Sequence, residues 1–107
     1  MQLIITRTAL VDLEELNEYL RERSPSGLRN VMASLKATMA TIPNEVSRGR
    51  KSKFRDDVWE KIDTNYGYVI PYFIENDTAY VLRIYNGRRK KLTAQDIEES
   101  LKARNDI

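Results

Sequence analysis

The sequence predicts an α+β fold in which a helical hairpin packs on a small, mostly antiparallel sheet. Two helical apolar stripes follow each other in the first half and are separated by Ser24-Pro25. Residues 68–84 hold β-branched and aromatic side chains on both sides of Asn76-Asp77, which is typical of a β-hairpin. The chain has 107 residues, enough for one small domain but not for two useful cores. We therefore expect a single domain over residues 1–107, with the element order β-α-α-β-β-β-α.

The N-terminal part is predicted to contain a short strand over Gln2–Thr6 and then a helix. Thr8 is the expected N-cap of this helix. Apolar residues recur at helical spacing at Ala9, Leu13, Leu16 and Leu20. The acidic residues off this stripe are Asp12, Glu14, Glu15, Glu18 and Glu22, and we interpret them as a solvated face; a docking face for a basic partner is the alternative.

A second helix is predicted from Pro25 to Thr41. Ser24 is its expected N-cap, and Pro25 suits the first helical position because its missing N–H needs no partner there. Pro43 should end the helix. Since the two helices are joined by a short turn and each has one apolar face, they should form an antiparallel hairpin that covers the sheet.

The second half is predicted to form a three-stranded antiparallel meander and a last helix. A strand over about Val58–Ile62 precedes the hairpin. Pro71 lies within the first hairpin strand and cannot donate to a ladder, so we expect a bulge or a broken neighbour there. Thr93 and Asp96 are the expected N-cap and third residue of a helix over about 94–103, within a C-terminal segment of residues 92–107.

The composition excludes several chemistries. The chain has no cysteine and no histidine, which removes disulfides, thiolate nucleophiles, Cys/His zinc sites and imidazole acid–base catalysis. The apolar run Leu3–Ile5 is too short for a signal peptide, and no run approaches the roughly 20 apolar residues of a membrane span. We expect a cytoplasmic protein that acts without a membrane, a metal or another cofactor.

Basic residues gather in two clusters, although the net charge is only +2. The first cluster contains Arg48, Arg50, Lys51, Lys53 and Arg55. The second cluster contains Arg83, Arg88, Arg89, Lys90 and Lys91. Each cluster is interpreted either as a solubilising surface or as a surface for phosphates or an acidic partner. If the two clusters meet in space, they form one concave positive patch.

The order of elements, together with several short motifs, resembles the RelE/ParE superfamily of bacterial toxins. The resemblance rests on residues 9–20 in the first predicted helix and on Ser24-Pro25, Ile42-Pro43 and Gly49-Arg50. The most telling motifs are Tyr68-Val-Ile-Pro71-Tyr72 and Val81-Leu-Arg83-Ile-Tyr-Asn-Gly87-Arg88-Arg89, which are similar to the ParE-like branch. Nearly the whole chain is covered, and the proline within the first motif is frequent in ParE-like sequences.

The resemblance implies the toxin component of a type II toxin–antitoxin module, also described as a plasmid stabilisation protein. ParE-like toxins inhibit growth by binding DNA gyrase. A cognate antitoxin would neutralise the toxin in a hetero-oligomer, and its apolar anchors are expected between the helical hairpin and the sheet. The target-binding residues expected on this basis are Arg50, Lys51, Lys53, Arg55, Arg83, Arg88, Arg89 and Lys90.

Two alternatives remain open at this stage. One is a RelE-like, ribosome-dependent mRNA endonuclease, whose candidate catalytic residues would be Tyr85, Arg83, Arg88 and Arg50. Asn86 stands where the family frequently has a histidine, and a tyrosine of pKa about 10 is a poor base at neutral pH unless cations lower that pKa. The sequence therefore favours a binding protein over an enzyme. The other alternative is a non-toxic basic binding module.

Overall fold

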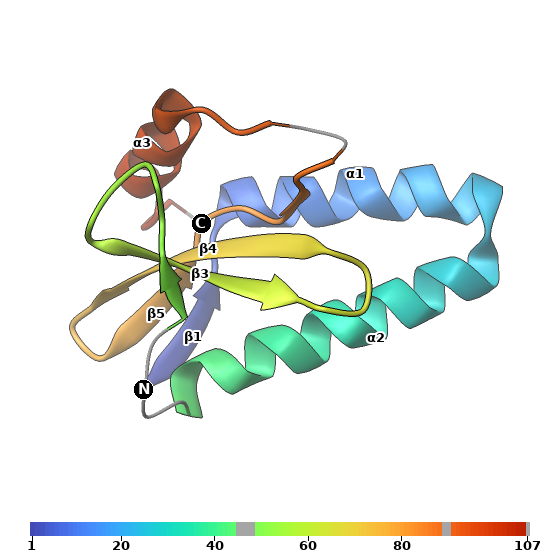
Figure 1. Cartoon of the computed structure of the whole chain (residues 1–107), viewed down its shortest axis with the longest axis horizontal. Coiled ribbons are helices and arrows are strands. Elements are labelled where there is room, and N and C mark those ends of the chain that lie inside the picture. The colour runs from blue at the N-terminus through green and yellow to red at the C-terminus, as the bar shows by residue number, and fades with distance from the viewer. Residues whose placement is uncertain (45–48, 89–90, 107) are drawn as a thin grey trace.

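A mostly antiparallel sheet lies between a helical hairpin and a single C-terminal helix (Figure 1). The computed structural model describes residues 1–44, 49–88 and 91–106. The strand order is β1 (Gln2–Ile5), β5 (Thr78–Val81), β4 (Tyr68–Glu75), β3 (Val58–Asp63) and β2 (Arg50–Lys51), and β6 (Tyr85–Asn86) also pairs with β4. The pairing of β1 with β5 is parallel and the others are antiparallel. The predicted fold class and the β3-β4-β5 meander are confirmed, whereas the two-residue strands β2 and β6 were not predicted.

The helices form as the sequence predicts, with one change at the first N-cap. Helix α1 covers Arg7–Arg23 and begins at Thr6, whose hydroxyl accepts from the Ala9 N–H. The prediction of Thr8 as the cap was wrong, because its hydroxyl donates instead to the Leu82 carbonyl at 2.7 Å. Helix α2 covers Pro25–Thr41 with Ser24 as N-cap, as predicted, and the short 3₁₀ helix η1 (Ile42–Asn44) follows. Among the described residues, no helix has the length and apolar content needed to cross a membrane.

The two faces of the sheet carry separate cores. The helix-side core packs side chains of the α1–α2 hairpin against the even-numbered residues of β4, such as Ile70 and Tyr72. The outer core lies under α3 (Ala94–Lys102) and contains Val58, Leu82, Leu92, Ile97 and Leu101. Thr93 and Asp96 form a capping box at the start of α3, which confirms the predicted start of this helix. Burial of the two α3 side chains contributes about 1.5–3 kcal/mol each, so α3 is a packed part of the fold.

The turn between β4 and β5 has the geometry that its residues allow. Asn76 and Asp77 have positive φ angles of 50° and 58°, which matches the preference of Asx residues for tight hairpin turns. The register then runs from Glu75 opposite Thr78 to Tyr72 opposite Val81. The predicted hairpin and its turn are therefore confirmed.

The irregularity expected at Pro71 is a bulge opposite it. The β4–β5 ladder ends with Tyr72 opposite Val81, and the β4–β6 ladder resumes with Val69 opposite Tyr85. Two residues of β4, 70–71, therefore face three residues, 82–84, and Arg83 is the extra one. The Pro71 carbonyl accepts from the Leu82 N–H, so the N–H that proline lacks would point to the same side of β4. The bulge thus occurs where the ladder lacks a donor.

Helix α1 supplies the hydrogen bonds that the bulge removes from the ladder. The Asp12 carboxylate accepts from the Ile84 N–H at 2.9 Å and from two guanidinium nitrogens of Arg83 at 2.7 and 2.9 Å. Thr6 and Thr8 hydroxyls donate to the carbonyls of Val81 and Leu82. The interpretation of Asp12 as part of a solvated acidic face was wrong, because this residue is buried against the bulged strand.

Removal of the Asp12 carboxylate should destabilise the protein strongly. Asp12→Ala leaves the mostly buried Arg83 guanidinium and the Ile84 N–H without their acceptor, so we expect a loss of about 3–5 kcal/mol in the free energy of unfolding. Urea unfolding followed by the fluorescence of Trp59, the single tryptophan, measures it. Glu18→Ala, on the exposed face of α1, is the control and should change the stability by less than about 0.5 kcal/mol. Equal stability of the two variants would contradict this account of the bulge.

Candidate functional site

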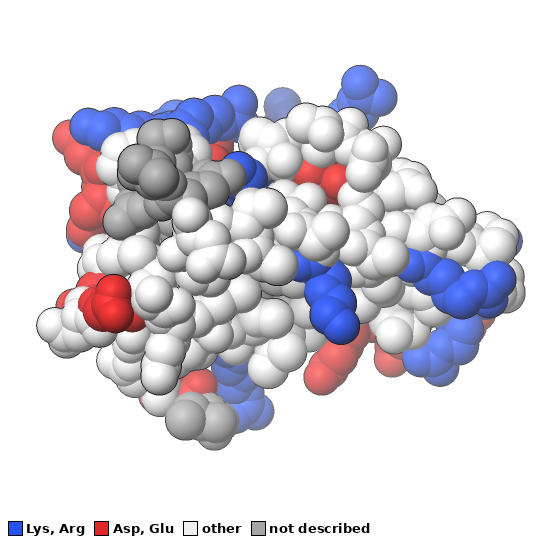
Figure 2. Space-filling model, turned by 90° about the horizontal axis from the view of Figure 1, so that it is seen from below, with Lys and Arg blue, Asp and Glu red and all other residues white. Residues whose placement is uncertain are grey.

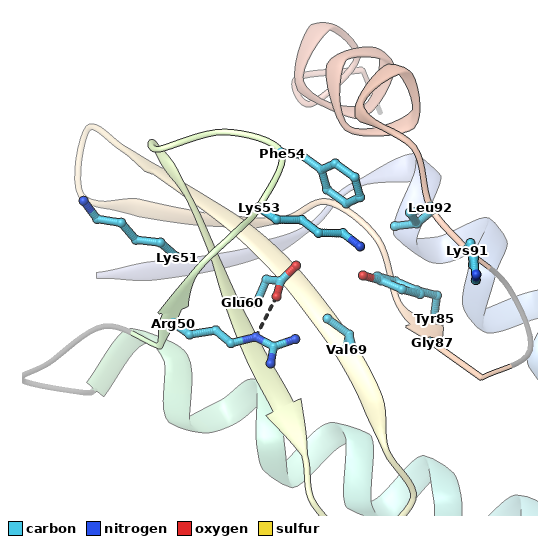
Figure 3. A pocket seen from close by; sticks show the side chains of 10 residues that line it. All are labelled: Arg50, Lys51, Lys53, Phe54, Glu60, Val69, Tyr85, Gly87, Lys91 and Leu92. Carbon is cyan, nitrogen blue, oxygen red and sulfur yellow. Dashed lines mark hydrogen bonds and ion pairs between the residues drawn. The ribbon is translucent and has the colours of Figure 1, made fainter.

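A cavity of about 560 Å³ opens on the outer face of the sheet, beside α3 (Figure 3). Its lining residues come from β2 and the segment after it, from β3, β4 and β6, and from the segment before α3: Arg50, Lys51, Lys53, Phe54, Glu60, Val69, Tyr85, Gly87, Lys91 and Leu92. Three of its cations belong to the first basic cluster and Lys91 belongs to the second. Three residues of the first cluster and Lys91 of the second cluster therefore line one concave basic surface, and we call this surface the basic pocket.

The positive charge is a local feature of the molecule. The basic pocket is lined by four cations and one carboxylate, whereas the whole chain has a net charge of only +2. Seen from below the view of Figure 1, the molecule has a large continuous area without charged side chains (Figure 2). Helix α2, which is lowest in Figure 1, has only Arg29 and Lys36 as charged residues. The basic pocket is thus distinct from an evenly distributed solubilising charge.

Gly49 allows the short strand β2, which contains Arg50, to pack closely against β3. A Cβ atom at this position would overlap with the carbonyl oxygen of Glu60. The Gly49 N–H also donates to the Tyr72 hydroxyl at 2.9 Å. Only a residue without a side chain lets β2 approach β3 this closely. The register then places Arg50 opposite Glu60, so that both side chains lie on the outer face of the sheet.

Arg50 neutralises the one acid in the pocket and keeps part of its own guanidinium open. Its Nε lies 2.8 Å from the Glu60 carboxylate, whose side chain is only 5% exposed, while the Arg50 side chain is 64% exposed. The Lys53 ammonium lies 5.2 Å from the centre of the Phe54 ring. In the close-up, Lys53 and Arg50 extend toward the cavity, whereas Lys51 points away from it (Figure 3). The Lys51 ammonium instead lies 5.8 Å from the centre of the half-buried Trp59 ring.

Tyr85 reaches the basic pocket because of the bulge. The one-residue shift places Val81 and Ile84 on the helix side, so Tyr85 emerges on the outer face opposite Val69. Burial raises the pKa of the Tyr85 phenol, the Glu60 carboxylate raises it further, and Arg50 lowers it to a smaller extent. The phenol is therefore protonated at neutral pH and can donate a hydrogen bond, but it is poorly suited to remove a proton.

The other predicted site residues fall into three groups: residues in ion pairs, an exposed residue, and residues outside the described part of the chain. Arg83 is bound to Asp12 with only 13% of its side chain exposed, and the hydrogen-bonded carboxylate holds its pKa above the ordinary value. Arg55 forms ion pairs with Asp57 and Glu98 at 2.8 Å, which raise the pKa of Arg55. Arg88 is exposed and lies outside the pocket lining. Arg89 and Lys90 lie outside the described residues.

Sequence reasoning missed one important member of the site. Glu60 lies within the strand predicted over about Val58–Ile62, but no role was predicted for it. Its pairing with Arg50 depends on β2, which is too short to leave a periodic pattern. Asn86 was noted for replacing a histidine; its side-chain oxygen accepts from the Arg88 N–H and closes the turn after β6. The Gly49-Arg50 pair was the sequence signal closest to this part of the site, since Gly49 marks a close approach of two backbones.

Comparisons with known proteins bear on the fold and on the family of the chain. A solved structure described as the chromosomal ParDE TA system from P. aeruginosa superimposes with a TM-score of 0.70 and 20% sequence identity, over 80% of this chain and 95% of that one. At that identity the likeness shows the fold alone. A family model described as the ParE toxin of type II toxin–antitoxin system, parDE, matches residues 3–91. The chain therefore belongs to the ParE toxin family, and the resemblance to the ParE-like branch is confirmed. No curated protein sequence matches the chain.

A side chain at Gly49 should disturb β2 and the position of Arg50. Gly49→Ala forces β2 away from the Glu60 carbonyl, so we expect a loss of roughly 1–3 kcal/mol in the free energy of unfolding. Gly87→Ala is the matched control, because a Cβ there meets no atom within 4 Å and no positive φ is required. Urea unfolding of both variants measures the difference. Equal stabilities would show that the close approach at Gly49 does not constrain the strand.

Proposed function

We propose that this toxin arrests bacterial growth by binding DNA gyrase and is neutralised by a cognate antitoxin. Membership of the ParE toxin family supports this proposal. The observation that favours gyrase binding over RNA cleavage is the chemistry of the side chains in the basic pocket. Its cations suit binding, but its phenol has a raised pKa and the chain has no histidine to move a proton. The exposed cations Lys51 and Arg88, together with Arg50 and Lys53, are proposed to contact the target.

The proposed antitoxin contact lies beside β1, the edge strand of the sheet. A hollow of about 500 Å³ is lined there by residues of β1, the start of α1 and the C-terminal segment. Ile4, Leu10 and Val11 lie in it with 38%, 46% and 43% of their surface exposed. Large apolar side chains gathered next to an open strand edge favour a protein partner, which would cover both the side chains and the edge.

Expression in a bacterium tests the proposed function. We expect growth arrest with induction of the DNA-damage response and filamentous cells, because stalled gyrase leaves broken DNA. Co-expression of the antitoxin encoded next to the toxin should restore growth. Normal growth with abundant soluble protein would contradict the proposal. Rapid translation arrest with cleaved messages would instead favour the ribosome-dependent endonuclease, for which the presence of Tyr85 among several cations is the supporting observation.

The Tyr85 hydroxyl is expected to be dispensable for toxicity. Tyr85→Phe keeps the ring in the outer core and removes only the hydroxyl, so a toxin that acts by binding gyrase should retain growth arrest within about twofold of the wild-type induction threshold. Colony counts across a range of inducer concentrations measure this. A loss of toxicity of about 100-fold or more, with unchanged protein level, would indicate an acid–base role and favour RNA cleavage.

Charge reversal of exposed cations near the pocket should weaken toxicity. In the variant Lys51→Glu/Arg88→Glu, neither side chain has an ion-pair partner to lose among the described residues, so the fold should persist while target contact is lost. The control variant Lys36→Glu/Lys102→Glu makes the same charge change at exposed sites on α2 and α3. Colony counts after induction compare the two. If both variants are equally toxic, this surface does not contact the target.

A further inference from the structure

The turn after β6 places a side-chain amide next to a backbone nitrogen that nothing shields. Asn86 is the only asparagine in the sequence that precedes a glycine. Gly87 has no Cβ atom, so its N–H is open to the side chain of the residue before it. Gly87 is also exposed, and a Cβ atom built there would meet no atom within 4 Å. In Figure 3 this residue lies beside Tyr85 at the edge of the basic pocket. The peptide bond between Asn86 and Gly87 is therefore open to water and free to change its geometry.

We propose that Asn86-Gly87 is a self-modification site at which the chain converts Asn86 into aspartate or isoaspartate. Solvent takes the proton of the Gly87 N–H, the Gly87 nitrogen bonds to Asn86 Cγ, and the Cγ–Nδ2 bond breaks. The amide nitrogen takes up a proton from solvent and leaves as ammonia, and a succinimide ring remains. Water then opens the ring: breaking the N–Cγ bond gives aspartate, and breaking the original N–C bond of the main chain gives isoaspartate. The proposal goes beyond the proposed function, since neither the target nor the antitoxin takes part.

A hydrogen bond holds the Asn86 side chain against the peptide group that attacks it. Asn86 Oδ1 accepts from the Arg88 N–H at 3.0 Å, which is the hydrogen bond of an Asx turn. This bond folds the side chain back over the Gly87 peptide, so the two reacting atoms belong to one tightly closed loop of the chain. Negative charge develops on Oδ1 as the Gly87 nitrogen attacks Cγ. A backbone N–H that already donates to this oxygen stabilises that charge.

The leaving nitrogen of Asn86 is held only weakly. Its Nδ2 donates to the Tyr66 carbonyl at 3.4 Å, which is at the long end for a hydrogen bond. The contact is exposed to solvent, and Asn86 itself is only half-buried. Little interaction energy is therefore lost when ammonia departs, and water reaches the ring that it must open.

Asn65 provides an internal comparison in the turn between β3 and β4. Its Nδ2 donates to the Ser34 hydroxyl at 2.9 Å, so its amide is held more firmly than that of Asn86. The next residue is Tyr66, whose N–H donates to the Asp63 carboxylate at 3.2 Å. The nitrogen that would attack Asn65 is thus already bound and has a bulky side chain beside it. We expect Asn65 to stay intact under conditions that convert Asn86.

Conversion changes both the charge and the path of the chain at this turn. The formal net charge of the chain is +2, and conversion of Asn86 adds one negative charge beside the exposed Arg88. Isoaspartate also adds a carbon atom to the main chain at the position where β6 pairs with Tyr68. The modified toxin therefore has a less basic and less regular segment next to Tyr85.

Peptide mapping of the purified chain tests the proposal. The chain is incubated at neutral pH and physiological temperature, and trypsin then releases residues 84–88, which lie between two arginine cleavage points. Chromatography with mass spectrometry separates the asparagine, aspartate and isoaspartate forms of this peptide, and a sample digested before incubation corrects for conversion during digestion. We expect both acidic forms to accumulate at position 86. Isoaspartate is the diagnostic product, because direct hydrolysis of the side-chain amide gives aspartate alone.

Two comparisons test the role of Gly87 and the role of the fold. Gly87→Ala adds only a methyl group in open space, so the fold should persist while conversion at Asn86 slows about tenfold or more. Circular dichroism confirms that the variant is folded. A capped peptide of residues 80–92 gives the rate of conversion without the fold. We expect the folded chain to convert within about tenfold of the rate of this peptide, because the turn leaves both reacting groups accessible.

Each of three results would overturn the proposal. The first is formation of aspartate without isoaspartate, which would exclude attack by the Gly87 nitrogen. The second is an unchanged rate in Gly87→Ala, which would remove the role of the unshielded N–H. The third is conversion in the folded chain that is more than about tenfold slower than in the peptide, or no faster than at Asn65, which would show that the turn protects Asn86.

Discussion

The contact between Asp12 of α1 and the bulged strand at Arg83 is the constraint on which the arrangement depends. One carboxylate accepts two guanidinium hydrogen bonds and the Ile84 N–H, which the ladder leaves without a partner. Arg83 also lies 4.0 Å from Asp96 in the first turn of α3, so one side chain links both helical layers. The shift that this contact stabilises turns Tyr85 to the outer face. A register that separated Asp12 from Arg83 would leave a buried charge without its partner, which costs about 3–5 kcal/mol in typical cases.

The sequence predicted the features that depend on neighbouring residues. Ser24-Pro25, Asn76-Asp77 and the Thr93/Asp96 capping box act within a few positions, and each has the predicted role. Pro71 even indicated where the sheet is irregular. The features that were missed depend on contacts between residues far apart in the sequence. In the sequence, Asp12 is one of several acidic residues on a polar helix face, and its partner Arg83 lies 71 positions away. No local pattern distinguishes it from Glu14 or Glu15.

The roles of the basic residues also depend on contacts between residues far apart in the sequence. Arg83, Arg55 and Lys53 look alike in the sequence, yet Arg83 specifies the fold, Arg55 ties the segment after β2 to α3, and Lys53 faces the cavity. Because acidic partners occupy several of them, the number of cations overstates the size of the binding surface. The cations without an acidic partner form a site suited to holding an anionic partner. The Tyr85 phenol beside them is kept protonated by burial and by Glu60. This is the physical basis for preferring a binding toxin to a nuclease.

The most direct measurement combines the purified toxin with purified DNA gyrase and plasmid DNA. The account predicts that ATP-dependent supercoiling stops and that linear DNA appears after denaturation and proteolysis, because gyrase is held on cleaved DNA. Tyr85→Phe should act in the same way. Unchanged supercoiling at a large excess of toxin, together with cleavage of messenger RNA in a translating extract, would contradict it.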